Sequence, residues 1–84
     1  MNADFSEIEN RILATMDLDP VAEFCKKHGT EDFYAALVAE IVGRPPSQDE
    51  RRIVKKELYL WMYGFIRQMT VPEALQLART VLLT

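Results

Sequence analysis

Four side chains that could bind a nucleotide recur at every fourth position in the second half of the chain. They are Arg51, Lys55, Tyr59 and Tyr63. In an α-helix each step of four residues drifts by only roughly 40°, so the four would share one broad face. Arginine and lysine bind phosphate, and phenol rings stack on bases. The spacing therefore predicts a helix with one face that could hold a nucleotide.

Apolar residues follow the other side of this predicted helix at the spacing of a buried stripe. They are Ile53, Val54, Leu58, Trp61, Met62, Phe65 and Ile66. Large apolar residues are so dense over 58–63 that an 84-residue domain can hardly bury them all. An exposed apolar patch of this kind marks a protein interface. The candidate interface residues are Leu58, Leu60, Trp61 and Met62. The alternative, that Leu60 and Trp61 complete a small core, stays open.

The basic and aromatic face resembles a motif of a known enzyme family. Residues 51–64 read Arg-Arg-x-x-Lys, then a ring four residues later, then Tyr-Gly. This pattern resembles the fingers helix of the family A, or DNA polymerase I-like, DNA polymerases. The resemblance implies that Arg51 and Lys55 hold the triphosphate of an incoming nucleotide. It also implies that Tyr59 packs against the sugar and base and that Tyr63 lies near the template base.

A second stretch, at the start of the chain, is similar to motif A of the same family. Residues 4–14 follow its order of Asp, aromatic, Ser, Ile, Glu and Arg, with Glu7 and Asn10 as departures. The resemblance implies a metal-binding role for Asp4 and a place beneath the ribose for Glu9. Without the resemblance, Asp4 reads as a solvated acid and Glu9 as a helix-capping side chain.

The resemblance runs from Asp4 to about residue 72 but does not supply an active site. Tyr34 stands where the family has a histidine that contacts phosphate, and a phenol can hydrogen-bond a phosphate without carrying positive charge. The chain has no counterpart of motif C, which provides the second metal-binding carboxylate of the family. Two-metal phosphoryl transfer needs carboxylates that converge on both ions. We therefore predict no catalytic residue, no enzyme activity and no cofactor for this chain alone.

About five helices are expected to position these residues, in one all-α domain over residues 1–84 that resembles isolated polymerase fingers. They are expected over residues 6–16, 19–27, 30–42, 47–66 and 73–83. Asp19, Thr30 and Ser47 are the predicted N-caps of the three middle helices, because short polar side chains satisfy the first free backbone N–H groups. Gly43 is the predicted C-cap of the third helix.

Composition and charge are those of a small globular protein. Hydrophobic residues make up 49% of the chain, and no apolar run approaches the roughly 20 residues that span a bilayer. A single cysteine, Cys25, is expected as a small buried hydrophobe, and it fits a reducing cytoplasm. The net charge is −3, with the acidic excess in residues 1–43 and a basic excess in residues 44–84. Tight nonspecific binding to duplex DNA is therefore not expected.

Three functions are compatible with the sequence. The first is a phage-encoded fragment of polymerase fingers that acts by contacting a protein, either another copy of itself, a replication protein or a host regulator. The second is the fingers subunit of a split polymerase, which would bind a deoxynucleoside triphosphate and Mg²⁺. The third is weak binding of a free nucleotide or single-stranded DNA by the same face. The departures from the family at Leu58, Leu60 and Tyr34 favour the first.

Overall fold

The structure, a computed structural model, describes residues 12–64 and 68–83, and for residues 62–64 it describes only the backbone. Four helices lie in this part of the chain: α2 (Leu18–Lys27), α3 (Phe33–Val42), α4 (Gln48–Gly64) and α5 (Val71–Leu82). Residues 12–14 are also helical. No strand occurs among the described residues, which contain one isolated parallel β-bridge between Met16 and Met69. The prediction of an all-α fold is confirmed.

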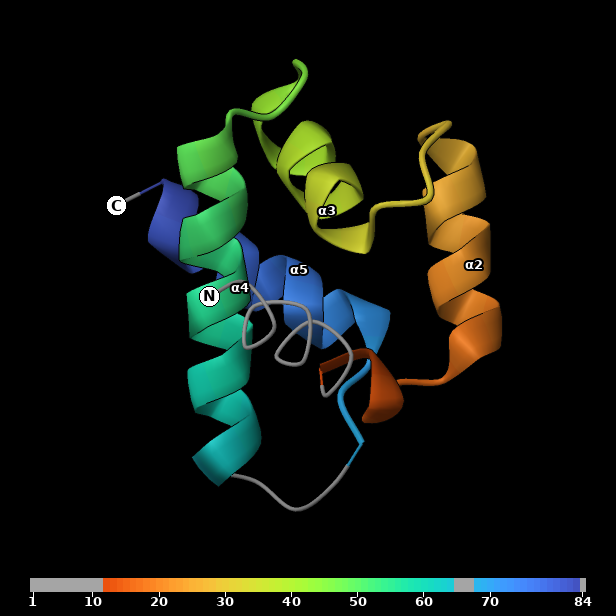
Figure 1. The fold of residues 1–84 in the computed structure, drawn as a ribbon, viewed down its shortest axis with the longest axis vertical. Helices are drawn as coiled ribbons and strands as arrows, with labels where there is room; N and C mark the ends of the chain where they lie inside the picture. Colours follow the sequence, from red (N-terminus) through yellow and green to blue (C-terminus); the bar gives the residue numbers. More distant parts are fainter. Residues whose placement is uncertain (1–11, 65–67, 84) are drawn as a thin grey trace, which may run out of the picture.

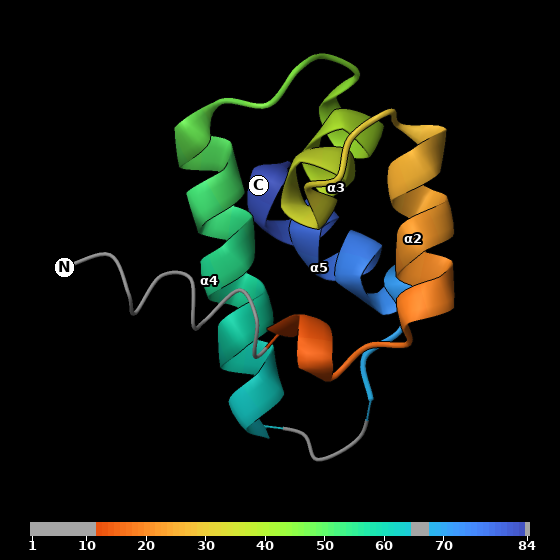
Figure 2. The ribbon, with the colours of Figure 1, turned by 45° about the vertical axis from the view of Figure 1, so that its right-hand side comes forward.

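Helices α3 and α5 lie between α2 and α4 (Figures 1 and 2). Helix α5 packs against each of the other three helices, and α3 packs against both α2 and α4. A single apolar cluster fills the space between them. Its fully buried large side chains are Ile12, Tyr34, Leu37, Val38, Val54, Leu58 and Met69. The face of α4 that carries Val54 and Leu58 therefore points into the molecule.

Two helix ends follow the predicted capping chemistry, and a third helix, α2, ends at the predicted residue. Ser47 and Glu50 form a capping box at the start of α4, where the Ser47 N–H donates to Glu50 at 2.9 Å and the Glu50 N–H donates to Ser47 Oγ at 3.2 Å. Gly43 ends α3 in the left-handed conformation, with φ of 73°, which costs glycine little because it has no Cβ. Lys27 is the last residue of α2, and His28 is its C-cap.

Two predicted N-caps are wrong. Asp17, not Asp19, caps α2, and its carboxylate accepts from the Asp19 N–H at 3.3 Å. Asp32, not Thr30, caps α3, and its Oδ1 accepts from two backbone N–H groups of the first turn, at 3.0 and 3.1 Å. Thr30 instead orients the cap, because its hydroxyl accepts from the Asp32 N–H at 3.0 Å. In both places the sequence offers two polar residues two positions apart, and the local pattern does not rank them.

The first and last predicted helices differ from the structure at their ends. Residues 6–11 of the first lie outside the described residues, and Thr15 and Met16 have left the helix. The last helix begins two residues earlier than predicted, with Thr70 as N-cap and a capping box to Glu73. Proline in the first turn fits this earlier start, because a proline there has no N–H that needs a partner. The predicted continuation of α4 over 65–66 also lies outside the described residues.

The ion pair between Arg44 and Glu50 predicts a pH dependence at the start of α4. Arg44 contacts the Glu50 carboxylate at 2.7 Å and, together with Ser47, lowers the pKa of Glu50 from 4.5 to about 2. The folded state holds this proton less tightly than the unfolded state. The stabilisation is therefore fully present above about pH 4.5 and is lost as the pH falls towards 2. Thermal unfolding followed by circular dichroism should show a smaller loss of melting temperature in this window for Glu50→Gln than for wild type. An equal loss in both would contradict the role of this pair.

Candidate functional site

Arg51 lies at the junction of α4 and α3, where it is held by an acid of its own chain. Its guanidinium Nη2 lies 2.5 Å from Asp32 Oδ2, and both side chains are partly exposed. The other carboxylate oxygen of Asp32 caps α3, so one aspartate fixes both the start of α3 and the position of Arg51. The buried Nε of Arg51 has no hydrogen-bond partner among the described residues. The predicted triphosphate ligand is thus already paired with an anion.

Lys55 lies one turn further along α4 and is buried. Only 5% of it is exposed, and its Nζ lies 5.5 Å from the centre of the Tyr34 ring, a cation–π arrangement. Tyr34 itself, in the first turn of α3, is 2% exposed. Lys55 and Tyr34 therefore do not lie on an open surface of the molecule, and their predicted contact with phosphate stays a prediction. The physical reason is that the first turn of α3 packs over this part of α4.

The remaining residues of the predicted nucleotide site are only partly described. Tyr59 is partly buried and packs against the core cluster. Tyr63 lies within α4, but its side chain lies outside the described residues, as do Glu9 and the predicted metal ligand Asp4. Among the described members of the predicted nucleotide-binding face, Arg51, Lys55 and Tyr59 do follow one side of α4. That side points towards α3 and the core rather than away from the molecule.

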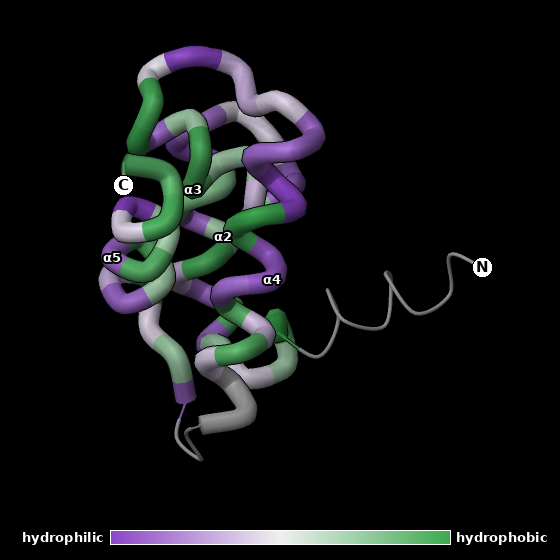
Figure 3. The backbone as a smooth tube through the Cα atoms, turned by 90° about the vertical axis from the view of Figure 1, so that its left-hand side faces the viewer, coloured by the Kyte–Doolittle hydropathy of each residue, from purple (hydrophilic) through white to green (hydrophobic). Residues whose placement is uncertain are grey.

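The opposite side of α4 carries exposed apolar residues. Figure 3 shows that hydrophobic and hydrophilic residues alternate along this helix. Leu60 is 55% exposed and Ile53 is 46% exposed. They are seven residues apart, which is two helical turns, so they lie above one another on the same outward stripe. The prediction that Ile53 belongs to the buried stripe is wrong, because the core lies on the side of Val54 and Leu58.

The predicted interface divides into a buried and an exposed part. Leu58 is completely buried and belongs to the core, so it is not available to a partner. Leu60 is exposed and is not part of the core, which excludes the alternative that it completes a small core. Trp61 is half-buried and packs against the core cluster. The side chain of Met62 lies outside the described residues. Residues 58–63 were predicted to be too apolar to be buried completely, and the exposure of Leu60 agrees with this prediction.

Trp61 also forms one wall of a groove between α4 and α5. The groove has a volume of about 270 Å³ and is lined by Trp61, Glu73, Gln76, Leu77 and Thr80. The four α5 residues follow the spacing i, i+3, i+4, i+7, so they make one stripe along that helix. This stripe was not predicted from the sequence, because only one of its four residues, Leu77, is apolar.

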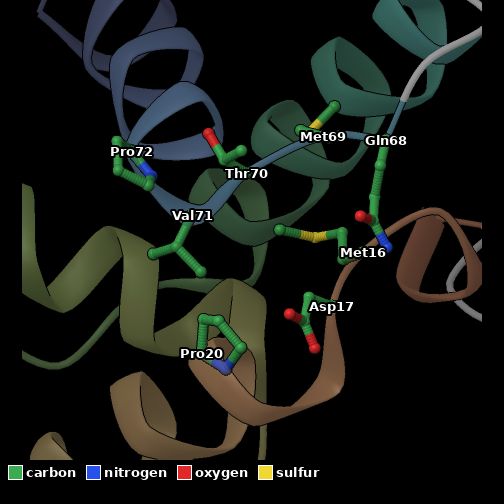
Figure 4. Close-up of a pocket in the computed structure, with 8 residues that line it drawn as sticks. All are labelled: Met16, Asp17, Pro20, Gln68, Met69, Thr70, Val71 and Pro72. Carbon is green, nitrogen blue, oxygen red and sulfur yellow. The ribbon is translucent and has the colours of Figure 1, made fainter.

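Two other clefts adjoin the start of α2. Figure 4 shows the smaller one, of about 200 Å³, between the residues that precede α2 and those that precede α5. It flanks the β-bridge, in which the Met69 N–H donates to the Thr15 carbonyl at 3.1 Å. The second, of about 380 Å³, lies along α2 beside the exposed Leu18 and the buried Cys25. The predicted burial of Cys25 is confirmed, and burial raises the pKa of its thiol.

His28, the single histidine, binds an acid on the next helix. Its Nε2 lies 2.7 Å from Glu40 Oε1, which joins the C-terminal end of α2 to α3. This contact lowers the pKa of the Glu40 carboxyl. No group of three or more histidine, cysteine or acidic residues that could hold a metal ion occurs within residues 12–64 and 68–83.

Within the described part of the chain, no helix is both long enough and apolar enough to cross a bilayer.

Comparison with known proteins adds no relative. No protein-family model, curated protein or solved structure matches the chain.

Proposed function

We propose that this chain is a non-catalytic module, derived from family A polymerase fingers, that acts by binding another protein through the outward stripe of α4. The observation that carries the proposal is the exposure of Leu60 and Ile53, 55% and 46%, two turns apart on one helix face. Among the described residues only Leu18 and Leu83 are other large hydrophobic side chains of comparable exposure. A paired apolar stripe of this kind is a helix surface suited to packing against another protein.

The state of the basic face supports a protein partner over a nucleotide. A triphosphate would have to displace Asp32 from Arg51, and it would have to reach Lys55 through the packing of Tyr34. Displacing Asp32 would lose its electrostatic attraction to Arg51, and moving Tyr34 would lose its apolar packing. The outward stripe needs no such rearrangement before it can bind.

Leu60→Asp tests the proposal. In a first measurement, light scattering on the eluate of a size-exclusion column, we expect a wild-type dimer and a Leu60→Asp monomer with an unchanged helical signal. The reason is that a buried carboxylate in an apolar contact has no compensating partner. Leu18→Asp is the matched control, because Leu18 is 68% exposed on α2, on the other side of α3 and α5. Loss of helix in Leu60→Asp would contradict a surface role for Leu60. A monomeric wild type would exclude self-association and leave a partner of different sequence.

The split-polymerase alternative is tested with the same samples. Because Arg51 and Lys55 are engaged within the chain, we expect a deoxynucleoside triphosphate with Mg²⁺ to leave the melting temperature unchanged. We also expect no primer extension by the purified chain. A rise in melting temperature that Lys55→Met abolishes would favour the alternative, in which a second polypeptide supplies the palm and the second metal-binding carboxylate.

A further inference from the structure

The groove between α4 and α5 adjoins the proposed contact surface. Trp61, which forms its α4 wall, follows Leu60 directly in the chain. The opposite wall is the α5 stripe of Glu73, Gln76, Leu77 and Thr80. A volume of about 270 Å³ is below the range of roughly 300–1,000 Å³ for sites that enclose a drug-sized ligand. The groove is therefore of a size to take one large side chain.

The lining combines an aromatic ring with acceptors of hydrogen bonds. Glu73 is held in place by its capping box, in which Oε1 accepts from the Thr70 N–H at 3.0 Å and from the Thr70 hydroxyl at 3.1 Å. Gln76 is exposed one turn later, and its side-chain carbonyl can accept a hydrogen bond. The hydroxyl of Thr80 donates to the Gln76 backbone carbonyl at 2.9 Å, which leaves its oxygen as an acceptor.

We propose that this groove receives an arginine side chain of the protein partner. A guanidinium is flat, permanently charged and weakly hydrated, so it can stack on the indole of Trp61. Its fork of donors can reach the acceptors on the α5 side. The inference rests on the proposed function, because it names the chemistry of the partner that binds beside Leu60.

Other side chains fit the lining less well. An acidic or phosphorylated side chain would be repelled by the carboxylate of Glu73. An aromatic or aliphatic side chain would cover the Gln76 amide without giving its carbonyl oxygen a donor, which costs free energy. A lysine carries the right charge, but its compact and strongly hydrated ammonium stacks poorly on a ring.

The charges around the groove agree with a cationic occupant. Glu57 lies one turn before Trp61 on α4, and it is partly exposed. Arg79 is the nearest base in sequence on α5, and it is not among the residues that line the groove. Arg79 follows Gln76 by three residues, so its side chain lies at the edge of this stripe.

Trp61 makes the test direct, because it is the single tryptophan of the chain and its fluorescence reports on the groove. The probes are three capped tripeptides, Ala-X-Ala, in which X is arginine, lysine or glutamine. We expect a saturable change in Trp61 emission with the arginine peptide at millimolar concentration. The lysine peptide should bind about fivefold more weakly, because it loses most of the stacking. The glutamine peptide should give no saturable change.

Two substitutions at Gln76 shift the affinity in opposite directions without changing the size of the side chain greatly. Gln76→Glu adds a second carboxylate to the groove and should tighten binding of the arginine peptide by about threefold. Gln76→Lys adds a cation and should weaken it by about tenfold. Gln48→Glu and Gln48→Lys are the matched controls. Gln48 is exposed at the other end of α4, and its substitutions change the net charge by the same amounts as those at Gln76. Both controls should bind as wild type.

The outcomes separate this inference from the proposed function. Equal responses to the arginine and glutamine peptides, or no saturable response, would overturn the arginine site. So would an equal effect of the Gln76 and Gln48 substitutions, which would indicate only attraction by net charge. None of these results alters the light-scattering comparison of wild type with Leu60→Asp. A normal peptide response in a Leu60→Asp variant whose oligomeric state is unchanged would instead retain the groove and reject the stripe.

Discussion

Replacing Leu58 by alanine is expected to lower the free energy of unfolding by about 3 kcal/mol. Leu58 is completely buried in the cluster that joins α3, α4 and α5. Its truncation would remove apolar contacts and leave a cavity that the surrounding helices fill only in part. Small domains often have only about 5 kcal/mol of stability, so this one change should leave the protein close to unfolding. Urea denaturation followed by circular dichroism at 222 nm measures the difference.

The neighbouring leucine is the matched control for this prediction. Leu60 follows Leu58 by two positions and is 55% exposed. Leu60→Ala should therefore change the free energy of unfolding by less than about 0.5 kcal/mol. The same chemical truncation then has two very different effects on one helix. Similar losses at both positions would mean that α4 is rotated about its axis relative to the arrangement described above.

Asp32→Ala is expected to cost about 2 kcal/mol of stability, the second large effect. The substitution removes the N-cap of α3, which satisfies two backbone N–H groups. It also removes the anion beside Arg51, whose side chain is only partly exposed. Both losses act on the junction between α3 and α4. The same urea titration gives the size of the effect.

Asp32→Asn separates the two roles of this residue. Asparagine caps helices about as well as aspartate, but it cannot form the ion pair with Arg51. Because that pair is partly exposed, its loss should cost less than about 1 kcal/mol. If the asparagine variant is as unstable as the alanine variant, the ion pair is the main contribution and the cap is minor. Asp19→Ala should be nearly neutral by comparison, because Asp19 is not the N-cap of α2.

Helices and caps could be predicted where one chemical signal was unopposed. Ser47 is followed by Glu50 at the capping-box spacing, and the structure has this box. Gly43 is the sole glycine near the end of α3, and it adopts the expected conformation. Asp17 and Asp19 are both good caps, and proline at the next position suggested the wrong one. Such a choice depends on fractions of a kcal/mol that local sequence patterns do not resolve.

The candidate site was less predictable because helical periodicity gives the faces of a helix but not what packs on them. Arg51 and Lys55 do share a side of α4, as predicted. The start of α3 covers that side. Asp32 forms an ion pair with Arg51, and the ring of Tyr34 packs against Lys55. Leu58 and Leu60 look equivalent in an apolar run. Only the positions of α3 and α5 make one of them a core residue.

The bridge between Met16 and Met69 has a consequence for the order of folding. It joins chain segments about fifty residues apart, whereas most of the helix packing joins elements closer in sequence. Closing so long a loop has an entropic cost that is best met once α3, α4 and α5 already hold the two segments near each other. The bridge should therefore form after the rate-limiting step and break early in unfolding. Substitutions there would then accelerate unfolding while leaving the folding rate nearly unchanged.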